Sequence, residues 1–452
     1  MMIWLYALVN AFFLLWGFRY ARRVGYRTVI PFVVSLALLL IYCLITPVCF
    51  YLLGRETATG DAGYFRFVGK RITDYYEPGM LAYMIANGCF VAGFRCRHKA
   101  ESIAVGLLPA PASLPRLRWF VIGLYAVFMG VVLTDIGISG INVSAMLLGN
   151  SEERLMTSQS ATNTYYFRAF ADSIITTIIL YAYLNGSRLK LFLLIVPAFG
   201  LFALLGFRYR MILTVLGLVL VYFQHGTKIN KWRWAGVGLA LLYFVLAITH
   251  NRWLFITGAY DRMSLNPSSY SYTLLLDQTR GSLVDFNLLR YYDENLGLTH
   301  DYGTSMFGYV IIRVIPRQLF PTGEKPYPSP FIDVLDKSLE LPSGWLRIGE
   351  ATLHYGAFYA AFGWLGFFIM PFVMGRWISY VCGRNLSSTP LGFLKQILFS
   401  LALFQFITRG YFPQFVDHFV YLSIPLWLIG NRIRETTIAQ PTNLIPADDP
   451  VH

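Results

Sequence analysis

The stretch VIPFVVSLALLLIYCLITPVCFYLL, residues 29–53, contains no charged side chain. A helix needs about 20 apolar residues to cross the hydrocarbon core of a bilayer, so this stretch predicts a membrane-spanning helix. Comparable runs recur along the chain, from 2–18 near its start to 413–430 near its end. Apolar residues make up 56% of the sequence and charged residues only 13%, which no water-soluble core could accommodate. A soluble enzyme, a disordered chain and a disulfide scaffold are therefore excluded.

The apolar runs are continuous rather than alternating, which favours helices over a membrane β-barrel. We therefore predict an all-α polytopic membrane protein with about eleven transmembrane helices. The expected spans are 2–18, 29–53, 78–94, 119–134, 166–184, 191–207, 211–224, 234–250, 351–375, 393–408 and 413–430.

Positive charge predicts the side of the membrane on which each loop lies. Six alternate segments, the C-terminal tail included, hold 19 of the 37 Lys and Arg residues but only 4 of the 24 Asp and Glu residues. By the positive-inside rule these segments are cytoplasmic, and the N-terminus is extracytoplasmic. The same rule accounts for the net charge of +13, so no nucleic-acid partner is expected.

This topology leaves one long segment between spans eight and nine. It is too long for a simple connection, and we expect it to be structured and functional. Two of its stretches, 283–292 and 302–320, are amphipathic and aromatic and are predicted to lie in the membrane interface. The expected units are 1–250 with spans one to eight, a large extracytoplasmic loop at 251–350, spans nine to eleven at 351–434, and a disordered cytoplasmic tail at 435–452.

Motifs of metal-dependent and nucleotide-dependent enzymes are absent from the sequence. It contains no Walker A sequence, no DxD, no HExxH and no GxSxG. Its five cysteines show neither a CxxC pair nor zinc-type spacing. We therefore expect no metal and no cofactor, and any sugar transfer should be metal-free.

Arginine occurs on the expected extracytoplasmic side, where the positive-inside rule does not favour it. Arg208 and Arg210 lie in GFRYR between spans six and seven, and Arg409 lies in TRGYF at the end of span ten. Guanidinium holds phosphate through paired planar hydrogen bonds, so these arginines are candidate diphosphate ligands. The alternative is snorkelling to lipid headgroups or pairing with outer acids. The long loop adds Arg317 and Arg347 as diphosphate ligands, and Arg252 and Arg313 as other substrate contacts.

A group of candidate catalytic residues lies in the run GWLRIGEATLHYGAFYAAFGWLG, residues 344–366. On a helix, Arg347, Glu350 and His354 would share one face, because their spacing is three and then four positions. A carboxylate and an imidazole one turn apart offer a general base and a group that orients it. Glu350 and His354 are therefore the candidate catalytic residues, and Tyr355 beside them is a candidate substrate contact. A cluster that caps the helix is the structural alternative.

Three weaker signals involve acidic residues. Asp172 lies one turn after Arg168, a spacing typical of an ion pair within one helix. Asp417 and His418 open span eleven and could pair with the arginine that ends span ten. The run RYYDEN, 290–295, combines aromatic and acidic side chains, which suit sugar rings and membrane interfaces equally well.

Four segments occur in order along the chain: GFRYRMILTVL (206–216), FGYVIIRVIPRQLFPTGEKPYPSP (307–330), GEATLHYGAFYAAFGWLG (349–366) and the arginine of FITRGYF. Together they resemble the bacterial oligosaccharide repeat unit polymerases of the Wzy type, which include the O-antigen polymerases. The first 200 residues or so match that family only in hydropathy. An Arg followed eleven positions later by Gly, found in two outer loops of some members, is missing from the outer arginines here.

The resemblance implies a glycosyltransferase of the GT-C type in the bacterial plasma (inner) membrane. Its donor would be a growing glycan on undecaprenyl diphosphate, and its acceptor would be one lipid-linked repeat unit. The arginines would hold the diphosphate, and Glu350 or His354 would take the proton of the acceptor hydroxyl. Expected partners are these lipid-linked oligosaccharides, membrane lipids and a chain-length regulator protein.

Two other functions fit part of the pattern. An O-antigen ligase uses the same donor, but its acceptor is the lipid A-core. A flippase or transporter of lipid-linked sugars should show charged residues through the midplane of its spans and often paired repeats. Here the ionisable residues gather at the outer ends of the spans, which favours the polymerase.

Overall fold

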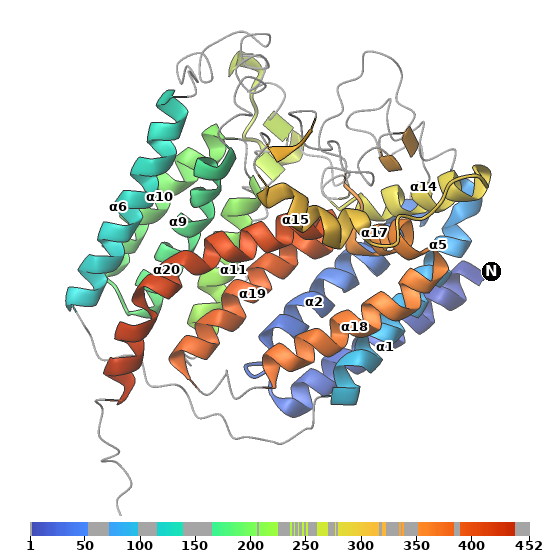
Figure 1. The fold of residues 1–452 in the computed structure, drawn as a ribbon, viewed down its shortest axis with the longest axis horizontal. Coiled ribbons are helices and arrows are strands. Elements are labelled where there is room, and N and C mark those ends of the chain that lie inside the picture. The colour runs from blue at the N-terminus through green and yellow to red at the C-terminus, as the bar shows by residue number, and fades with distance from the viewer. Residues whose placement is uncertain are drawn as a thin grey trace, which may run out of the picture.

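The computed structural model of the chain is a bundle of tilted helices (Figure 1). Within the part of the chain that it describes, every regular element is helical and no strand occurs. The described residues are 2–52, 72–97, 115–138, 165–205, 208–224, 260–269, 279–315, 319–321, 351–383 and 389–438, with single residues or pairs at 236, 239, 243, 246–247, 250–251, 276, 334–335 and 337–338.

The first half of the chain contributes α1 (Met2–Val24), α2 (Ile30–Leu40), η1 (Ile41–Ile45), α3 (Thr46–Leu52), η2 (Thr73–Tyr75), α5 (Tyr76–Arg97), α6 (Pro115–Ile138), α9 (Tyr165–Tyr183), α10 (Arg188–Leu204) and α11 (Arg208–Gln224). The second half contributes η4 (Tyr260–Arg262), η5 (Pro267–Ser269), α14 (Gly281–Glu294), η6 (Thr304–Gly308), α15 (Tyr309–Val314), α17 (His354–Phe362), α18 (Trp364–Cys382), α19 (Pro390–Arg409) and α20 (Phe412–Ile438).

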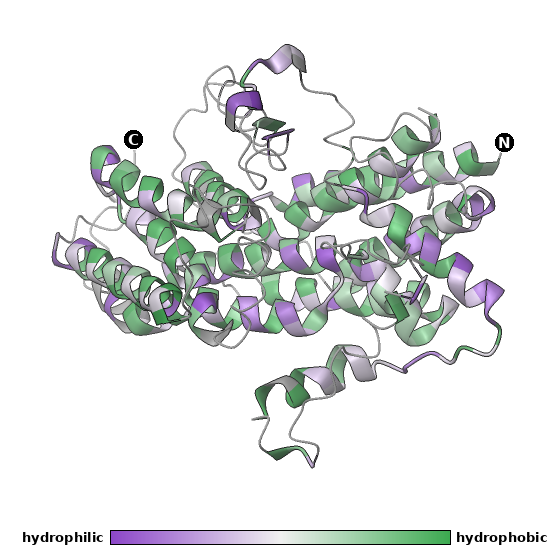
Figure 2. Ribbon diagram, turned by 90° about the horizontal axis from the view of Figure 1, so that it is seen from above, coloured by the Kyte–Doolittle hydropathy of each residue, from purple (hydrophilic) through white to green (hydrophobic). Residues whose placement is uncertain are grey.

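Several of these helices are suited to a lipid environment. Large apolar side chains of α1 remain uncovered, for example Leu8, Phe12 and Leu15, which are 62–69% exposed. Figure 2 shows hydrophobic residues along the helices of the bundle. Water would disfavour such a surface, whereas lipid accommodates it. Within the described part of the chain, six helical stretches are long and apolar enough to cross a membrane: Met2–Val24, Ile30–Leu52, Thr73–Cys96, Pro115–Ile138, Trp364–Cys382 and Pro390–Arg409.

For the described residues, the prediction of an all-helical fold with several helices able to cross a membrane is thereby confirmed, while the number eleven stays a prediction. Helices α9, α10, α11 and α20 coincide with four further expected spans but are shorter or less apolar than the six. The expected span at 234–250 lies mostly outside the described residues.

Glycine brings α5 and α18 into backbone contact. A Cβ atom added at Gly93 of α5 would lie 2.1 Å from the carbonyl oxygen of Phe372. A Cβ atom at Gly375 of α18 would lie 2.2 Å from the carbonyl oxygen of Phe90. Small residues allow such close helix crossings in membranes, where van der Waals packing rather than the hydrophobic effect drives association.

Replacing Gly93 by alanine is expected to force these two helices apart. The methyl group would meet backbone atoms that cannot rotate away, at an expected cost of about 1–3 kcal/mol. Gly130 of α6 is the matched control, because a Cβ atom there meets nothing within 4 Å. Thermal unfolding in detergent should therefore show a lower midpoint for Gly93→Ala than for Gly130→Ala. Equal midpoints would show that the close crossing contributes nothing.

The structure corrects the predicted span 351–375. Helix α17 ends at Phe362, and α18 begins at Trp364. The break lies at Gly363, which has φ +60° and ψ −147°. Residues other than glycine rarely adopt this backbone conformation. Helix α17 therefore has only nine residues, about 14 Å at 1.5 Å per residue, and is too short to cross a membrane.

Helix α14 is also placed differently from the prediction. Residues 283–292 were expected in the membrane interface, but every residue from 281 to 290 is buried. The helix is covered because it packs against α5, η1, α3 and α17. In Figure 1 the helices α14, α15 and α17 lie together across one end of the bundle. We call this end, which also holds the last turn of α19 and the first turn of α20, the α17 end.

Candidate functional site

Two segments that carry candidate site residues meet at the α17 end. Nδ1 of His354, the first residue of α17, lies 3.3 Å from the carbonyl oxygen of Ile407 in α19. Gly410 ends α19 with φ +64°, and a Cβ atom there would lie 2.6 Å from both Leu353 O and Thr352 Oγ1. The structure thus brings GEATLHYG and FITRGYF together, although more than 50 residues separate them.

Arg409 lies at this contact, as the last residue of α19. Its side chain is exposed, and its charge is favourable at the C-terminus of a helix. The residue therefore satisfies one requirement for a phosphate ligand, because its guanidinium is accessible at the end of a span. Its location also agrees with the alternative that it stabilises the helix terminus.

His354 is fully buried, which limits its chemistry. A carbonyl oxygen can only accept a hydrogen bond, so Nδ1 must donate to Ile407, and Nε2 carries the lone pair. Nε2 is buried and has no hydrogen-bond partner among the described residues. Burial lowers the pKa of His354 to about 3, so the imidazole is neutral at physiological pH. The ring is therefore placed to orient the segment that precedes it rather than to touch an external substrate.

Asp285 of α14 holds the start of α17 in place. Its Oδ1 accepts the backbone N–H of Leu353 at 2.9 Å, and its Oδ2 accepts that of Gly356 at 3.2 Å. These are the N-cap and N3 positions of α17, so one carboxyl group satisfies two amides that the helix leaves unbonded. Tyr83 of α5 donates its hydroxyl to Oδ2 at 2.8 Å. This role could not be predicted, because Asp285 is a single acid in the amphipathic run SLVDFNLL.

The stability contributed by Asp285 is expected to depend on pH. Burial raises the pKa of Asp285 well above its ordinary value, although three hydrogen bonds oppose the shift. A carboxyl group with a raised folded-state pKa contributes stability that is complete below the unfolded pKa of about 3.9. That contribution falls as the pH rises through the folded-state pKa.

Asp285→Asn tests this dependence, since the amide does not titrate. The difference in unfolding temperature between the natural chain and the variant should shrink from about pH 5 to about pH 8. A difference that grows over this range would mean that the charged carboxylate is the form that caps α17.

A buried polar chain continues from Tyr355 into the bundle. The Tyr355 hydroxyl donates to Asn87 Oδ1 at 2.7 Å, and Asn87 Nδ2 donates to Asn10 Oδ1 at 2.7 Å. Asn10 Nδ2 then donates to the carbonyl oxygen of Cys43 at 3.1 Å. Tyr355 is therefore a structural hydrogen-bond donor that ties α17 to α5 and α1, and its fully buried side chain leaves no surface for a substrate.

Arg210 is engaged in a second buried cluster. Its Nε lies 2.6 Å from Oδ1 of Asp172 in α9, and the other oxygen of Asp172 contacts Nδ1 of His418 in α20. All three side chains are buried. The predicted ion pair between Arg168 and Asp172 is wrong, because Arg168 instead binds Asp135 of α6 at 2.9 Å. Arg168 and Asp172 are one turn apart in α9, but each forms its ion pair with a residue on another helix.

Asp172→Asn is expected to destabilise the bundle strongly. The substitution leaves the Arg210 guanidinium buried without its counter-charge, which typically costs about 3–5 kcal/mol. Asp261→Asn is the control, because Asp261 and Arg262 are 77–80% exposed and 4.0 Å apart, and surface pairs contribute little. Unfolding in detergent should separate the two variants clearly. An unchanged midpoint for Asp172→Asn would remove this cluster from the interactions that hold α9, α11 and α20 together.

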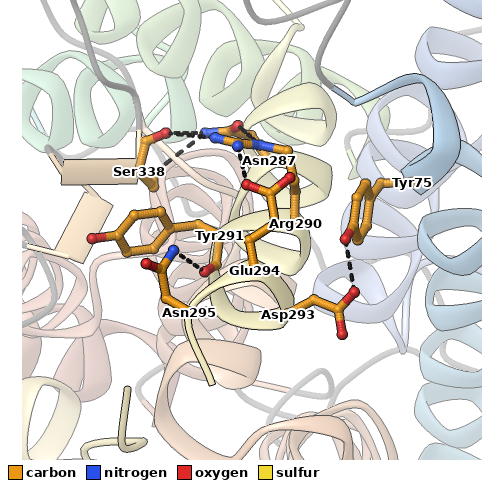
Figure 3. A network of polar contacts seen from close by, with 8 residues as sticks. All are labelled: Tyr75, Asn287, Arg290, Tyr291, Asp293, Glu294, Asn295 and Ser338. Carbon is orange, nitrogen blue, oxygen red and sulfur yellow. Dashed lines mark hydrogen bonds and ion pairs between the residues drawn. The ribbon is translucent and has the colours of Figure 1, made fainter. Parts of the chain in front are cut away.

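The run RYYDEN forms the last turn of α14 (Figure 3). Arg290 points inward, where it contacts Glu294 and donates to Asn287 Oδ1 at 3.1 Å and to Ser338 O at 3.3 Å. Asp293 accepts the hydroxyl of Tyr75 at 2.7 Å and remains exposed. The turn thus has a structural inner face and an acidic outer face.

The remaining candidates are only partly placed. Arg208 begins α11 and Arg313 lies in α15, but their side chains lie outside the described part of the structure. Positions two apart on a helix differ by about 200°, so position 208 belongs to the face of α11 opposite the buried Arg210. Four further candidates lie wholly outside the described residues: Arg252, Arg317, Arg347 and Glu350.

The described residues contain no group of three or more His, Cys, Asp or Glu that could hold a metal ion. In comparisons with known proteins, no family model, no curated protein and no solved structure matches the chain.

Proposed function

We propose that this chain is a glycosyltransferase of the GT-C type that polymerises oligosaccharide repeat units linked to undecaprenyl diphosphate. Its site would lie at the α17 end, on the extracytoplasmic side of a bacterial plasma membrane. The contact between the start of α17 and the end of α19 is the observation that supports it best. This contact joins the sequence segment that carries the candidate pair Glu350 and His354 to the helix that ends in the exposed Arg409.

The proposed chemistry assigns separate tasks to the two segments. Arg409, with Arg208 as a second candidate, would hold the diphosphate of the donor and stabilise its negative charge as it leaves. Glu350, four positions before His354, would accept the proton of the acceptor hydroxyl. His354 would act as a positioning residue, because it anchors the segment after Glu350 to the Ile407 carbonyl. Arg210 would hold α11 in place through Asp172.

Sugar recognition is proposed for the outer face of the RYYDEN turn. Asp293 and Asn295 are exposed there, and Tyr302, which follows along the chain, is 78% exposed. Aromatic rings can stack on sugar rings, and carboxylates accept their hydroxyl groups. Both substrates are lipids, so a site at the end of the bundle could be reached sideways from the bilayer.

The test uses purified full-length protein and synthetic undecaprenyl-diphosphate-linked repeat units. A polymerase should produce a ladder of longer glycans on the carrier lipid, and EDTA should leave the ladder unchanged. A product that appears only with a lipid A-core acceptor would identify a ligase instead. Movement of the lipid-linked unit across liposomes without any new glycosidic bond would identify a flippase. Loss of the ladder in EDTA and its return with Mg²⁺ or Mn²⁺ would contradict charge stabilisation by arginine alone.

A further inference from the structure

A small basic cavity lies at the other end of the bundle, between the start of α6 and the start of α10. It is half open, has a volume of about 170 Å³, and its walls include Pro115, Arg118, Trp119, Ser187 and Lys190. None of these residues contributes to the candidate site at the α17 end. We call this cavity the α6–α10 pocket.

The cations of the α6–α10 pocket are held by their surroundings. Arg118 donates Nε–H to the carbonyl oxygen of Leu184 at 2.8 Å. Nζ of Lys190 lies 4.4 Å from the ring centroid of Trp119, a cation–π contact. Ser187 caps α10, since its Oγ accepts the backbone N–H of Lys190 at 3.4 Å. The two positive groups therefore converge on one cavity in a defined arrangement.

The electrostatics of the helices add to this positive charge. Both α6 and α10 begin at the pocket, and neither has an acidic residue in its first turn. The N-terminus of a helix carries a partial positive charge, so acids normally stabilise it and cations destabilise it. The opposite pattern occurs here, because the first turns carry Arg116, Arg118, Arg188 and Lys190. An anion bound between the two helices would offset this repulsion.

The neighbouring surface distinguishes a lipid from a free anion. Trp119 is 62% exposed, and Leu193, three positions after Lys190 along α10, is 59% exposed. An exposed apolar strip that continues from a basic cavity fits the acyl chains of a phospholipid, whereas a free phosphate would leave it unused. Basic pockets between membrane helices bind anionic headgroups in this way.

We propose that the α6–α10 pocket is a binding site for the headgroup of an anionic phospholipid. The phosphate would lie between Arg118 and Lys190, and the acyl chains would follow Trp119 and Leu193. By the charge distribution of the loops, this lipid belongs to the cytoplasmic leaflet. The proposal is independent of the glycosyltransferase activity, because it concerns binding at the opposite end of the bundle.

Native mass spectrometry of the purified full-length protein tests the proposal. Dioleoyl phosphatidylglycerol is titrated against dioleoyl phosphatidylcholine, and inorganic phosphate is added as a competitor in a separate arm. The site predicts one phosphatidylglycerol molecule retained well beyond phosphatidylcholine and not displaced by millimolar phosphate. Equal retention of the two lipids, or displacement by phosphate alone, would overturn the assignment to a lipid headgroup.

Lys190→Gln and Arg188→Gln form a matched pair for the same measurement. Both residues are exposed, both lie in the first turn of α10, and each substitution removes one positive charge, but only Lys190 lines the pocket. Lys190→Gln should raise the apparent dissociation constant for phosphatidylglycerol about five-fold, the effect of one cation near an anionic lipid. Arg188→Gln should change it much less. Equal weakening by both would indicate a diffuse surface charge and not a site.

Discussion

Replacing Arg409 by alanine is expected to slow glycan extension by about 10²–10³-fold, the usual cost of removing one group that stabilises developing negative charge. The residue lies at the end of α19, beside the segment that leads into α17, and its side chain is exposed. The loss should appear in the rate of ladder formation with synthetic lipid-linked repeat units. The close approach of Gly410 to Leu353 is unchanged in this variant, and its unfolding temperature is measured alongside the rate to separate a loss of activity from a loss of folding.

Two further variants separate a specific phosphate contact from general charge. Arg409→Lys keeps the positive charge but loses the planar pair of donors, so it should recover only part of the rate. Arg262→Ala removes another exposed arginine, in η4, and should leave extension unchanged. Full activity of Arg409→Ala would exclude this residue as a diphosphate ligand and favour its alternative role at the helix terminus.

Glu350→Gln is expected to have a comparably large effect, about 10²–10⁴-fold on turnover, because it removes the proposed general base while keeping its shape. Binding of the lipid-linked donor should remain, since the amide retains hydrogen-bonding capacity. Rates at saturating donor, together with a separate binding measurement, distinguish the two effects.

His354→Gln serves as the comparison for Glu350→Gln. The histidine is buried against Ile407, so its replacement should reduce turnover less than Glu350→Gln and should also lower the unfolding temperature. A larger loss of turnover at His354 than at Glu350 would make the imidazole the base and the glutamate its orienting partner. Near-normal extension by both variants would exclude this segment from the chemistry.

Hydropathy predicted most of the helices, because each apolar run must form its backbone hydrogen bonds within itself in lipid. It could not locate the break at Gly363, since AFYAAFGWLGFF is apolar throughout and a positive φ leaves no compositional mark. It also misplaced α14, whose amphipathic pattern suits an interface when the helix is viewed alone. Its burial depends on α5 and α17, which approach it only in the folded chain.

Several residues of the candidate site were singled out from the sequence, but the contacts between them were not predicted. Arg210 and His418 were each singled out, but their common partner Asp172 was assigned to Arg168, because local spacing says nothing about helices 38 or 246 residues away. The meeting of His354 with Ile407 could not be derived from either segment alone. The role of Asp285 was missed for the same reason, since the amides that it caps lie 68 and 71 residues further along the chain.

The central claim is that a lipid-linked diphosphate binds where α17 meets the end of α19. A photoreactive undecaprenyl diphosphate analogue, with its reactive group beside the phosphates, tests this most directly when crosslinked peptides are identified by mass spectrometry. The account predicts labelling within 350–356 and 407–412, reduced by unlabelled lipid-linked repeat unit and weakened in Arg409→Ala. Labelling confined to the first turns of α6 and α10, at the opposite end of the bundle, would contradict it.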